Sequence, residues 1–144
     1  MSNDSFEFKK FKINQSKCAM KVGTDAVLLG SWVLPNGIKT ILDIGTGTGV
    51  IALMLAQKTK ALITAIDIDK ESTDQASLNV SESIFHSQVS VKHISFQELV
   101  KSSSQKFDLI VTNPPYFIDS LKSSGDSRNI ARHNDFLSFE DLIS

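Results

Sequence analysis

The feature that most constrains the fold is a run of alternate glycines between two apolar segments. Residues 43–49 read Asp-Ile-Gly-Thr-Gly-Thr-Gly; they begin within the mostly apolar run 40–44 and end directly before the apolar run 50–57. Glycine adopts positive φ at little cost, and it lets a ligand approach the backbone without an intervening side chain. We therefore expect a buried strand, a tight turn and a helix in succession, with a ligand held at the turn.

The residues that this turn lacks narrow the classes of ligand that it could bind. If the dinucleotide fingerprint G-x-G-x-x-G is aligned on Gly45 and Gly47, Val50 stands where the third glycine belongs. The turn also lacks the lysine followed by Ser or Thr that a phosphate-binding P-loop needs. The carboxylate of Asp43 would suit a cationic ligand and repel a pyrophosphate. The alternative is a tight strand–helix turn that binds nothing.

Segments with strand character alternate with helical segments along the rest of the chain. The expected strands are 40–44, 61–66, 89–94 and 107–111, and the expected helices are 50–57, 70–85 and 96–100. In the helix 70–85, Ala76, Val80 and Ile84 should form one apolar stripe. Strands and helices that alternate at this spacing predict an α/β fold with a mostly parallel sheet.

The N-terminal part carries a different pattern. Apolar and polar residues partly alternate over 6–13, which predicts a short strand or a hairpin. Residues 24–33 should form a helix capped by Thr24 or Asp25. Cys18 is the single cysteine, so the chain has no internal disulfide and no cysteine-rich zinc site, and we expect the thiol to be buried as a small apolar side chain.

Composition excludes some classes of function. The net charge is -1, so RNA binding would need a local basic patch rather than an overall positive field. The first ten residues are too charged for a signal peptide, and no apolar run approaches the ~20 residues that cross a bilayer. A lone cysteine fits a reducing compartment. We expect a soluble, cytoplasmic protein without a metal site.

An acidic residue ends the second expected strand. Asp67 lies 22 positions after Gly45. At this place in an open α/β sheet a carboxylate lies beside the ligand crevice and can accept both hydroxyls of a ribose. Asp69 is the nearby competitor, but its position suits the N-cap of the helix 70–85.

The tetrapeptide Asn113-Pro114-Pro115-Tyr116 follows the fourth strand, at the sheet edge where such folds bind ligands. The prolines fix the backbone, so the Asn113 side-chain oxygen and the Pro114 carbonyl would be two fixed acceptors. Together they suit a planar NH2 group, whose lone pair becomes localised when both N–H groups are bound. Tyr116 offers a flat face on which a flipped base can stack. The alternative is a loop that merely ends a strand.

These motifs resemble a known family. The turn 43–49 resembles motif I of the Rossmann-like S-adenosylmethionine-dependent methyltransferases, and the tetrapeptide resembles their NPPY-containing members. That group includes adenine-N6 enzymes of DNA and RNA, guanine-N2 enzymes of RNA and glutamine-N5 enzymes of release factors. The chain is most similar to the bacterial tRNA(Val) adenine-N6 methyltransferases, which modify the adenine 3′ of the anticodon. The segments that carry this similarity are 11–15, 18–32, 130–133 and 137–140.

The resemblance implies S-adenosylmethionine as cofactor, tRNA as substrate, and no membrane or metal. The implied cofactor-binding residues are Thr24, Asp25, Asp43, Gly45, Gly47, Gly49, Asp67, Ser95 and Phe96. The implied catalytic residues are Asn113, Pro114 and Tyr116, and the implied substrate contacts are Lys21, Pro115, Arg128, Arg132 and His133. Each of these sets has a structural alternative. Phe96 could equally belong to the core, and Thr24 and Asp25 could merely cap a helix. Arg128, Arg132 and His133 could lie on a solvated loop.

The resemblance also predicts how the chain is organised. Residues 1–38 would be an N-terminal hairpin and helix packed on the core, and residues 39–144 a partial S-adenosylmethionine-binding domain. Family members add strands beyond the fourth, which would otherwise be an uncovered edge of the sheet. We therefore expect a C-terminally truncated chain. Three functions remain open: a tRNA adenine-N6 methyltransferase, a glutamine-N5 or other RNA N-methyltransferase, and an inactive fragment that binds cofactor or RNA.

Overall fold

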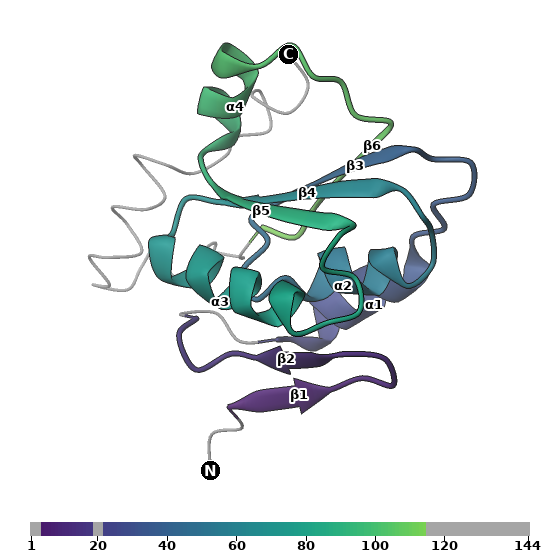
Figure 1. Ribbon diagram of the computed structural model, residues 1–144, viewed down its shortest axis with the longest axis vertical. Helices are drawn as coiled ribbons and strands as arrows, with labels where there is room; N and C mark the ends of the chain where they lie inside the picture. Colours follow the sequence, from purple (N-terminus) through teal and green to yellow (C-terminus); the bar gives the residue numbers. More distant parts are fainter. Residues whose placement is uncertain (1–3, 19–21, 115–144) are drawn as a thin grey trace.

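The computed structural model describes residues 4–18 and 22–114, which form a layered α/β structure around a parallel sheet (Figure 1). The sheet has the order β5-β4-β3-β6, with β3 (Thr40–Ile44), β4 (Leu62–Asp67), β5 (Val89–His93) and β6 (Leu109–Thr112). All three strand pairs are parallel. The helices are α1 (Thr24–Trp32), α2 (Val50–Ala56), α3 (Lys70–Ser81) and α4 (Phe96–Ser102). The predicted fold class, with its parallel α/β sheet, is confirmed.

The N-terminal segment forms the predicted hairpin. Strands β1 (Ser5–Glu7) and β2 (Lys12–Asn14) pair antiparallel and lie outside the layer of α1, α2 and α3 (Figure 1). Phe11 and Ile13 are buried and join the core beneath α2 and α3. The ring of Phe11 also stacks on that of Phe8, with the centroids 4.5 Å apart. The hairpin is therefore part of the packed structure through its apolar face.

The two faces of the sheet are covered unequally. Helices α1, α2 and α3 cover one face, where all seven residues of α2 are buried. A Cβ on Gly30 of α1 would lie only 2.6 Å from the sulfur of Met54, so glycine allows α1 and α2 to pack closely. On the other face a smaller cluster forms where Leu99 of α4 packs on the strand residues Leu42, Ile44 and Ile66. Since α4 has only seven residues, it covers only part of this face.

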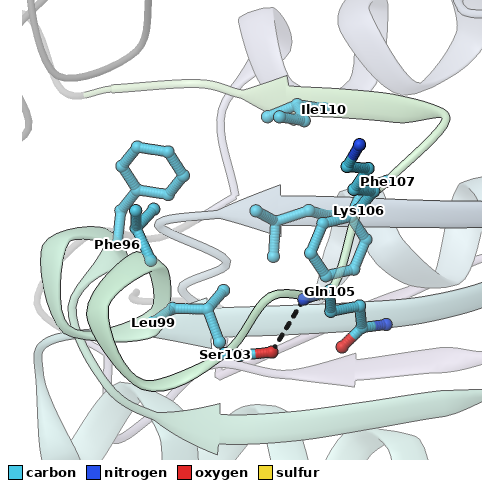
Figure 2. A pocket seen from close by; sticks show the side chains of 9 residues that line it. Phe96, Leu99, Ser103, Gln105, Lys106, Phe107 and Ile110 are labelled. Carbon is cyan, nitrogen blue, oxygen red and sulfur yellow. Dashed lines mark hydrogen bonds between the residues drawn. The ribbon is translucent and has the colours of Figure 1, made fainter. Parts of the chain in front are cut away.

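A cavity of about 330 Å³ lies on the thinly covered face (Figure 2). Its lining comes from β3, α4, the segment after α4 and β6, and consists of Leu42, Phe96, Leu99, Val100, Ser103, Gln105, Lys106, Phe107 and Ile110. No residue of the glycine turn lines it. Within the described part of the chain β6 is an edge of the sheet, as the sequence predicts.

Two local predictions about helices are wrong. The helix α3 ends at Ser81, four residues before its predicted end, because the chain turns at Ser83, whose N–H and O–H both donate to the carbonyl of Val80. Ala76 and Val80 are buried as predicted, but Ile84 lies past the helix and is 70% exposed. The apolar stripe therefore has two members rather than three.

The start of α1 also differs from the prediction. Its N-cap residue is Gly23, which is extended and makes no side-chain cap hydrogen bond. Thr24 and Asp25 are the first two helical residues, so neither is placed to cap the helix. The carboxylate of Asp25 instead lies in the first turn, where it complements the positive end of the helix dipole.

Candidate functional site

The glycine turn and Asn113 both follow the carboxyl ends of strands, so they leave the sheet at the same end. Strands β3 and β6 are parallel neighbours whose last residues, Ile44 and Thr112, pair with each other. The hydroxyl of Thr112 donates to the carbonyl oxygen of Ile44 at 3.1 Å. On the other side of β3, Ile44 pairs with Ile66 of β4, and Asp67 follows. The fold thus brings together, at one sheet edge, the ends of the three strands that carry the predicted site.

The glycine turn is held against β4 and open on another side. The N–H groups of Gly45 and Thr46 both donate to the carbonyl of Ile66, each at 2.9 Å. Gly45 and Gly47 have positive φ, 72° and 56°, and a Cβ on either would meet no atom within 4 Å. By contrast, a Cβ on Gly49 would lie 3.4 Å from that of Ala76 in α3. The first two glycines leave backbone accessible to a ligand, whereas the third allows close packing.

Asp67 is fixed by the turn that it faces. Its Oδ2 accepts the N–H of Gly47 at 2.8 Å, and its Oδ1 accepts the N–H of Asp69 at 3.0 Å. Burial raises the pKa of the Asp67 carboxyl, and the two N–H donors counteract that rise. The N-cap role predicted for Asp69 is confirmed, since Asp69 caps α3 by accepting the N–H and the hydroxyl of Ser72.

Asp43 lies beneath the turn rather than at its open side. The residue is 1% exposed, and its Oδ2 accepts the hydroxyl of Thr46 at 2.8 Å. Its Oδ1 has no hydrogen-bond partner among the described residues. The pKa of Asp43 is raised to about 7, mainly by burial; the Thr46 hydroxyl acts to lower it and the nearby carboxylate of Asp67 acts to raise it. Asp43 can therefore carry either charge state near neutral pH.

Ser95 and Phe96 begin the helix after β5. The Ser95 hydroxyl caps α4 by accepting the N–H of Glu98 at 3.1 Å. The N–H of Ile94 donates to the carbonyl of Asp67, so this segment continues along the same sheet edge. Phe96 is half-buried, packs against the smaller cluster and lines the cavity on the second face (Figure 2). These contacts favour the core role for the Phe96 ring.

The acceptor side of the predicted site is described as far as Pro114. Asn113 is half-buried and Pro114 is exposed, directly after β6. Thr24 and Asp25 are exposed at the start of α1, and Cys18 is buried, as expected. Six predicted residues lie outside the described residues, namely Lys21, Pro115, Tyr116, Arg128, Arg132 and His133.

The described residues contain neither a membrane-spanning helix nor a metal-binding cluster. None of the helices in residues 4–18 and 22–114 is both long and apolar enough to span a membrane. In the same part of the chain, no three His, Cys, Asp or Glu side chains are grouped so that they could hold a metal ion.

One residue at the site was missed by the sequence patterns. Asn79 of α3 is 1% exposed, and its Nδ2 donates to the carbonyl oxygen of Thr48 in the glycine turn at 2.8 Å. The same side chain accepts the N–H of Asn14 with its Oδ1 and donates from Nδ2 to the carbonyl oxygen of Asn14, each at 2.8 Å. The sequence signal that could have revealed Asn79 was a polar amide beside the apolar Val80, on the helix that follows Asp67.

Comparison with known proteins gives the family. The family described as methyltransferase small domain matches residues 16–133. A protein of Parabacteroides distasonis named tRNA1(Val) (adenine(37)-N6)-methyltransferase is 52% identical over 143 residues, which are 99% of this chain and 60% of that protein. A protein of the same name from Trichodesmium erythraeum is 49% identical over 146 residues, 99% of this chain and 61% of its own. The chain thus spans about 60% of the length of these relatives, and they confirm the resemblance that the motifs indicate.

Solved structures agree on the fold. A SAM-dependent methyltransferase from Agrobacterium tumefaciens superimposes with a TM-score of 0.64 at 16% identity, covering 80% of this chain and 41% of that one. TrmK of M. capricolum, solved with S-adenosyl-homocysteine, gives a TM-score of 0.53 at 23% identity and covers 65% of this chain and 41% of its own. Both have the Rossmann-like methyltransferase fold. With the family match over most of its length, this chain belongs to the methyltransferase small domain family.

Proposed function

We propose that the protein is an S-adenosylmethionine-dependent methyltransferase that modifies the N6 amino group of an adenine in tRNA, the adenine 3′ of the anticodon. One observation carries the proposal: the glycine turn and Asn113 follow paired ends of neighbouring parallel strands. A cofactor on the turn and an amino group on Asn113 would therefore lie side by side. The names of the relatives supply the substrate class.

The residues at the turn fit the cofactor. S-adenosylmethionine supplies an electrophilic methyl group on a sulfonium sulfur, and it also carries an ammonium group and a ribose. Gly45 and Gly47 leave room for such a ligand to approach the backbone. Asp67 presents a carboxylate that the Gly47 and Asp69 N–H groups hold in orientation, and it can accept ribose hydroxyls. The Asp43 carboxyl adds a second acidic group beneath the turn, which favours a cation over a pyrophosphate.

Asn113 and Pro114 would hold the acceptor. The Asn113 side-chain oxygen and the Pro114 carbonyl accept the two N–H groups of the adenine amino group, which localises the nitrogen lone pair. The nitrogen is acidic once it has been alkylated, so its proton can leave to water and no strong base is needed. Acceleration then comes from alignment of the amino group with the methyl and from fixed dipoles. In the structure, the Thr112 hydroxyl on Ile44 fixes the strand end that carries this residue.

The hairpin would contribute RNA contacts. Lys9, Lys10, Lys12 and Lys17 are all exposed. Acidic residues are fewer in this segment, with Asp4 and Glu7 at its start. Exposed lysines bind RNA phosphates without reading sequence, so this local patch can act although the net charge is -1. A tRNA substrate also agrees with the cytoplasmic location that the lone cysteine predicts.

The test is methyl transfer to defined acceptors. The purified protein is incubated with labelled S-adenosylmethionine and either unmodified tRNA or a release factor, and the tRNA is then digested to nucleosides. We expect label in N6-methyladenosine from tRNA and none in the release factor. Label in a glutamine of the release factor would identify a glutamine-N5 methyltransferase instead. Cofactor binding without transfer to either acceptor would identify a binding fragment.

A further inference from the structure

A single buried side chain joins the N-terminal hairpin to the glycine turn. Asn79 of α3 accepts the N–H of Asn14 with its Oδ1 and donates from Nδ2 to the carbonyl oxygens of Asn14 and Thr48, each at 2.8 Å. Its three contacts use the acceptor and both donors of the amide. Asn14 is the last residue of β2, and Thr48 lies between two glycines of the turn. The three segments are thus joined by one fully used amide.

A second amide on the same helix bonds, among the described residues, only the segment after β2. Gln75 lies one helical turn before Asn79 and is equally buried at 1% exposure. Its Oε1 accepts the N–H of Lys17 at 3.1 Å and the hydroxyl of Ser16 at 3.5 Å. The recorded hydrogen bonds of Gln75 therefore go to the segment after β2, whereas those of Asn79 go both to β2 and to the glycine turn. The two residues form a matched pair.

Besides the close packing of Gly49 on Ala76, the Asn79 amide on the carbonyl of Thr48 holds the glycine turn to α3. Flanking glycines are the most flexible backbone available. The N–H groups of Gly45 and Thr46 are tied to β4, and the N–H of Gly47 is tied to Asp67. The Asn79 amide holds the turn from α3, through a carbonyl rather than an N–H. A buried hydrogen bond to a backbone carbonyl fixes its direction, and losing it leaves the carbonyl unsatisfied.

We propose that Asn79 is a positioning residue for the cofactor site: it ties the glycine turn to β2, so that the docked hairpin helps to hold the turn in its binding geometry. This inference rests on the proposed function, because it takes the turn as the S-adenosylmethionine site. It assigns the hairpin a part in cofactor binding as well as the part in RNA binding proposed above. It also predicts that hairpin and turn respond to each other.

The test compares Asn79→Ala with Gln75→Ala. Both substitutions remove a buried amide that holds the N-terminal segment, so both should lower the melting temperature. Dissociation constants for S-adenosylmethionine and S-adenosyl-homocysteine are measured by calorimetry on the same proteins. We expect Asn79→Ala to weaken binding about tenfold, the effect of one lost buried hydrogen bond, and Gln75→Ala to change it less than about twofold. Equal affinities for the two variants would overturn the proposal.

A volume-preserving variant covers the case in which Asn79→Ala does not fold. Asn79→Asp keeps an acceptor for the N–H of Asn14 but, when ionised, cannot donate to Thr48, so it should also weaken cofactor binding by about tenfold or more. Amide exchange on the unmutated protein gives a measurement that needs no variant. Cofactor binding should slow exchange at the N–H of Asn14 severalfold, since coupling between two sites is reciprocal. Slower exchange at Gly47 with no change at Asn14 would contradict the link.

These experiments separate the two proposals. If the unmutated protein binds neither cofactor nor product, the proposed function fails and this inference fails with it. If the unmutated protein binds both and transfers methyl to tRNA, but Asn79→Ala binds as well as Gln75→Ala, the function stands and Asn79 is only a structural residue.

Discussion

The glycine turn and the Asn113–Pro114 segment leave adjacent strand ends, yet the fold holds them in different ways. The turn is tied from two sides, by N–H bonds to Ile66 and Asp67 and by the Asn79 amide on the carbonyl of Thr48. Among the described residues, the hydrogen bond nearest to Asn113 is that of the Thr112 hydroxyl to Ile44, and Pro114 is exposed.

This difference suggests two kinds of rigidity. The cofactor side is preorganised by hydrogen bonds from several elements of the fold. Within the described residues, the acceptor side is held by a strand end and by the restricted backbone of proline. Substitutions at the two places should therefore separate cofactor binding from methyl transfer.

The largest expected effect is that of Asn113→Ala on methyl transfer. The substitution removes a side-chain acceptor for the adenine amino group, and loss of one such preorganised group costs about 10²-fold or more in rate. Cofactor affinity should stay within about twofold. Among the described residues, none of the hydrogen bonds that hold the glycine turn comes from Asn113. Single-turnover transfer and calorimetry measure the two quantities. Asn113→Asp keeps an acceptor and should lose less activity. A parallel loss of cofactor affinity in Asn113→Ala would mean that the two sides are not separable.

The next effect is that of Asp67→Ala on cofactor affinity. The substitution removes the carboxylate expected to bind ribose and frees the N–H of Gly47, so the dissociation constant should rise by about tenfold to a hundredfold. Asp69→Ala is the matched control, because it removes the cap of α3 two residues away. It should cost about 1 kcal/mol of stability and leave affinity nearly unchanged. If Asp69→Ala weakened binding as much as Asp67→Ala, the roles assigned to the two aspartates would be reversed.

Gly47→Ala tests whether the open side of the turn is used by the ligand. Gly47 and Gly37 both have positive φ, 56° and 72°, and neither has an atom within 4 Å of a built Cβ. Alanine should cost about 1–2 kcal/mol of stability at either position, since L-residues are strained there. Only Gly47→Ala should also weaken cofactor binding, because its methyl group would stand in the ligand's path. Equal affinity in the two variants, measured by calorimetry, would show that the ligand does not approach the turn from this side.

The fold was predictable because its signals are local. Apolar runs gave all four strands of the parallel sheet within about two residues, and the glycine turn fixed the order of strand, turn and helix. Parallel pairing then required the carboxyl ends of the strands to share one edge, so the neighbourhood of Gly45, Asp67 and Asn113 follows from topology alone.

What could not be predicted depends on contacts between distant residues. Asn79 bonds Asn14 across 65 positions of sequence, and no helical pattern reveals that partner. The sequence also did not reveal on which side of the turn Asp43 lies. The motif suggests a carboxylate near the ligand, but alternation along β3 places Asp43 on the same face as Ile41, beneath the turn and beside α2. Side-chain burial and long-range hydrogen bonds, rather than secondary structure, were the missing information.

The smallest predicted effect concerns the charge of Asp43. Its pKa is raised to about 7 in the folded protein, mainly by burial, against an ordinary value of 3.8. The folded state therefore binds the proton more tightly than the unfolded state, so the contribution of Asp43 to stability is full below pH 3.8 and is lost as pH rises toward 7. Between pH 6 and 7 this loss amounts to about 1 kcal/mol.

Urea unfolding at a series of pH values measures that loss. Asp43→Asn removes the titrating group while keeping an acceptor for the Thr46 hydroxyl, so its stability should fall less than that of the unmutated protein over the same interval. If the cofactor side is built over a neutral acid, a bound cation should favour ionisation of Asp43, and cofactor should then shift the apparent pKa downward. An unmutated protein whose stability is level between pH 6 and 7, or rises, would show that Asp43 is already ionised beneath the turn.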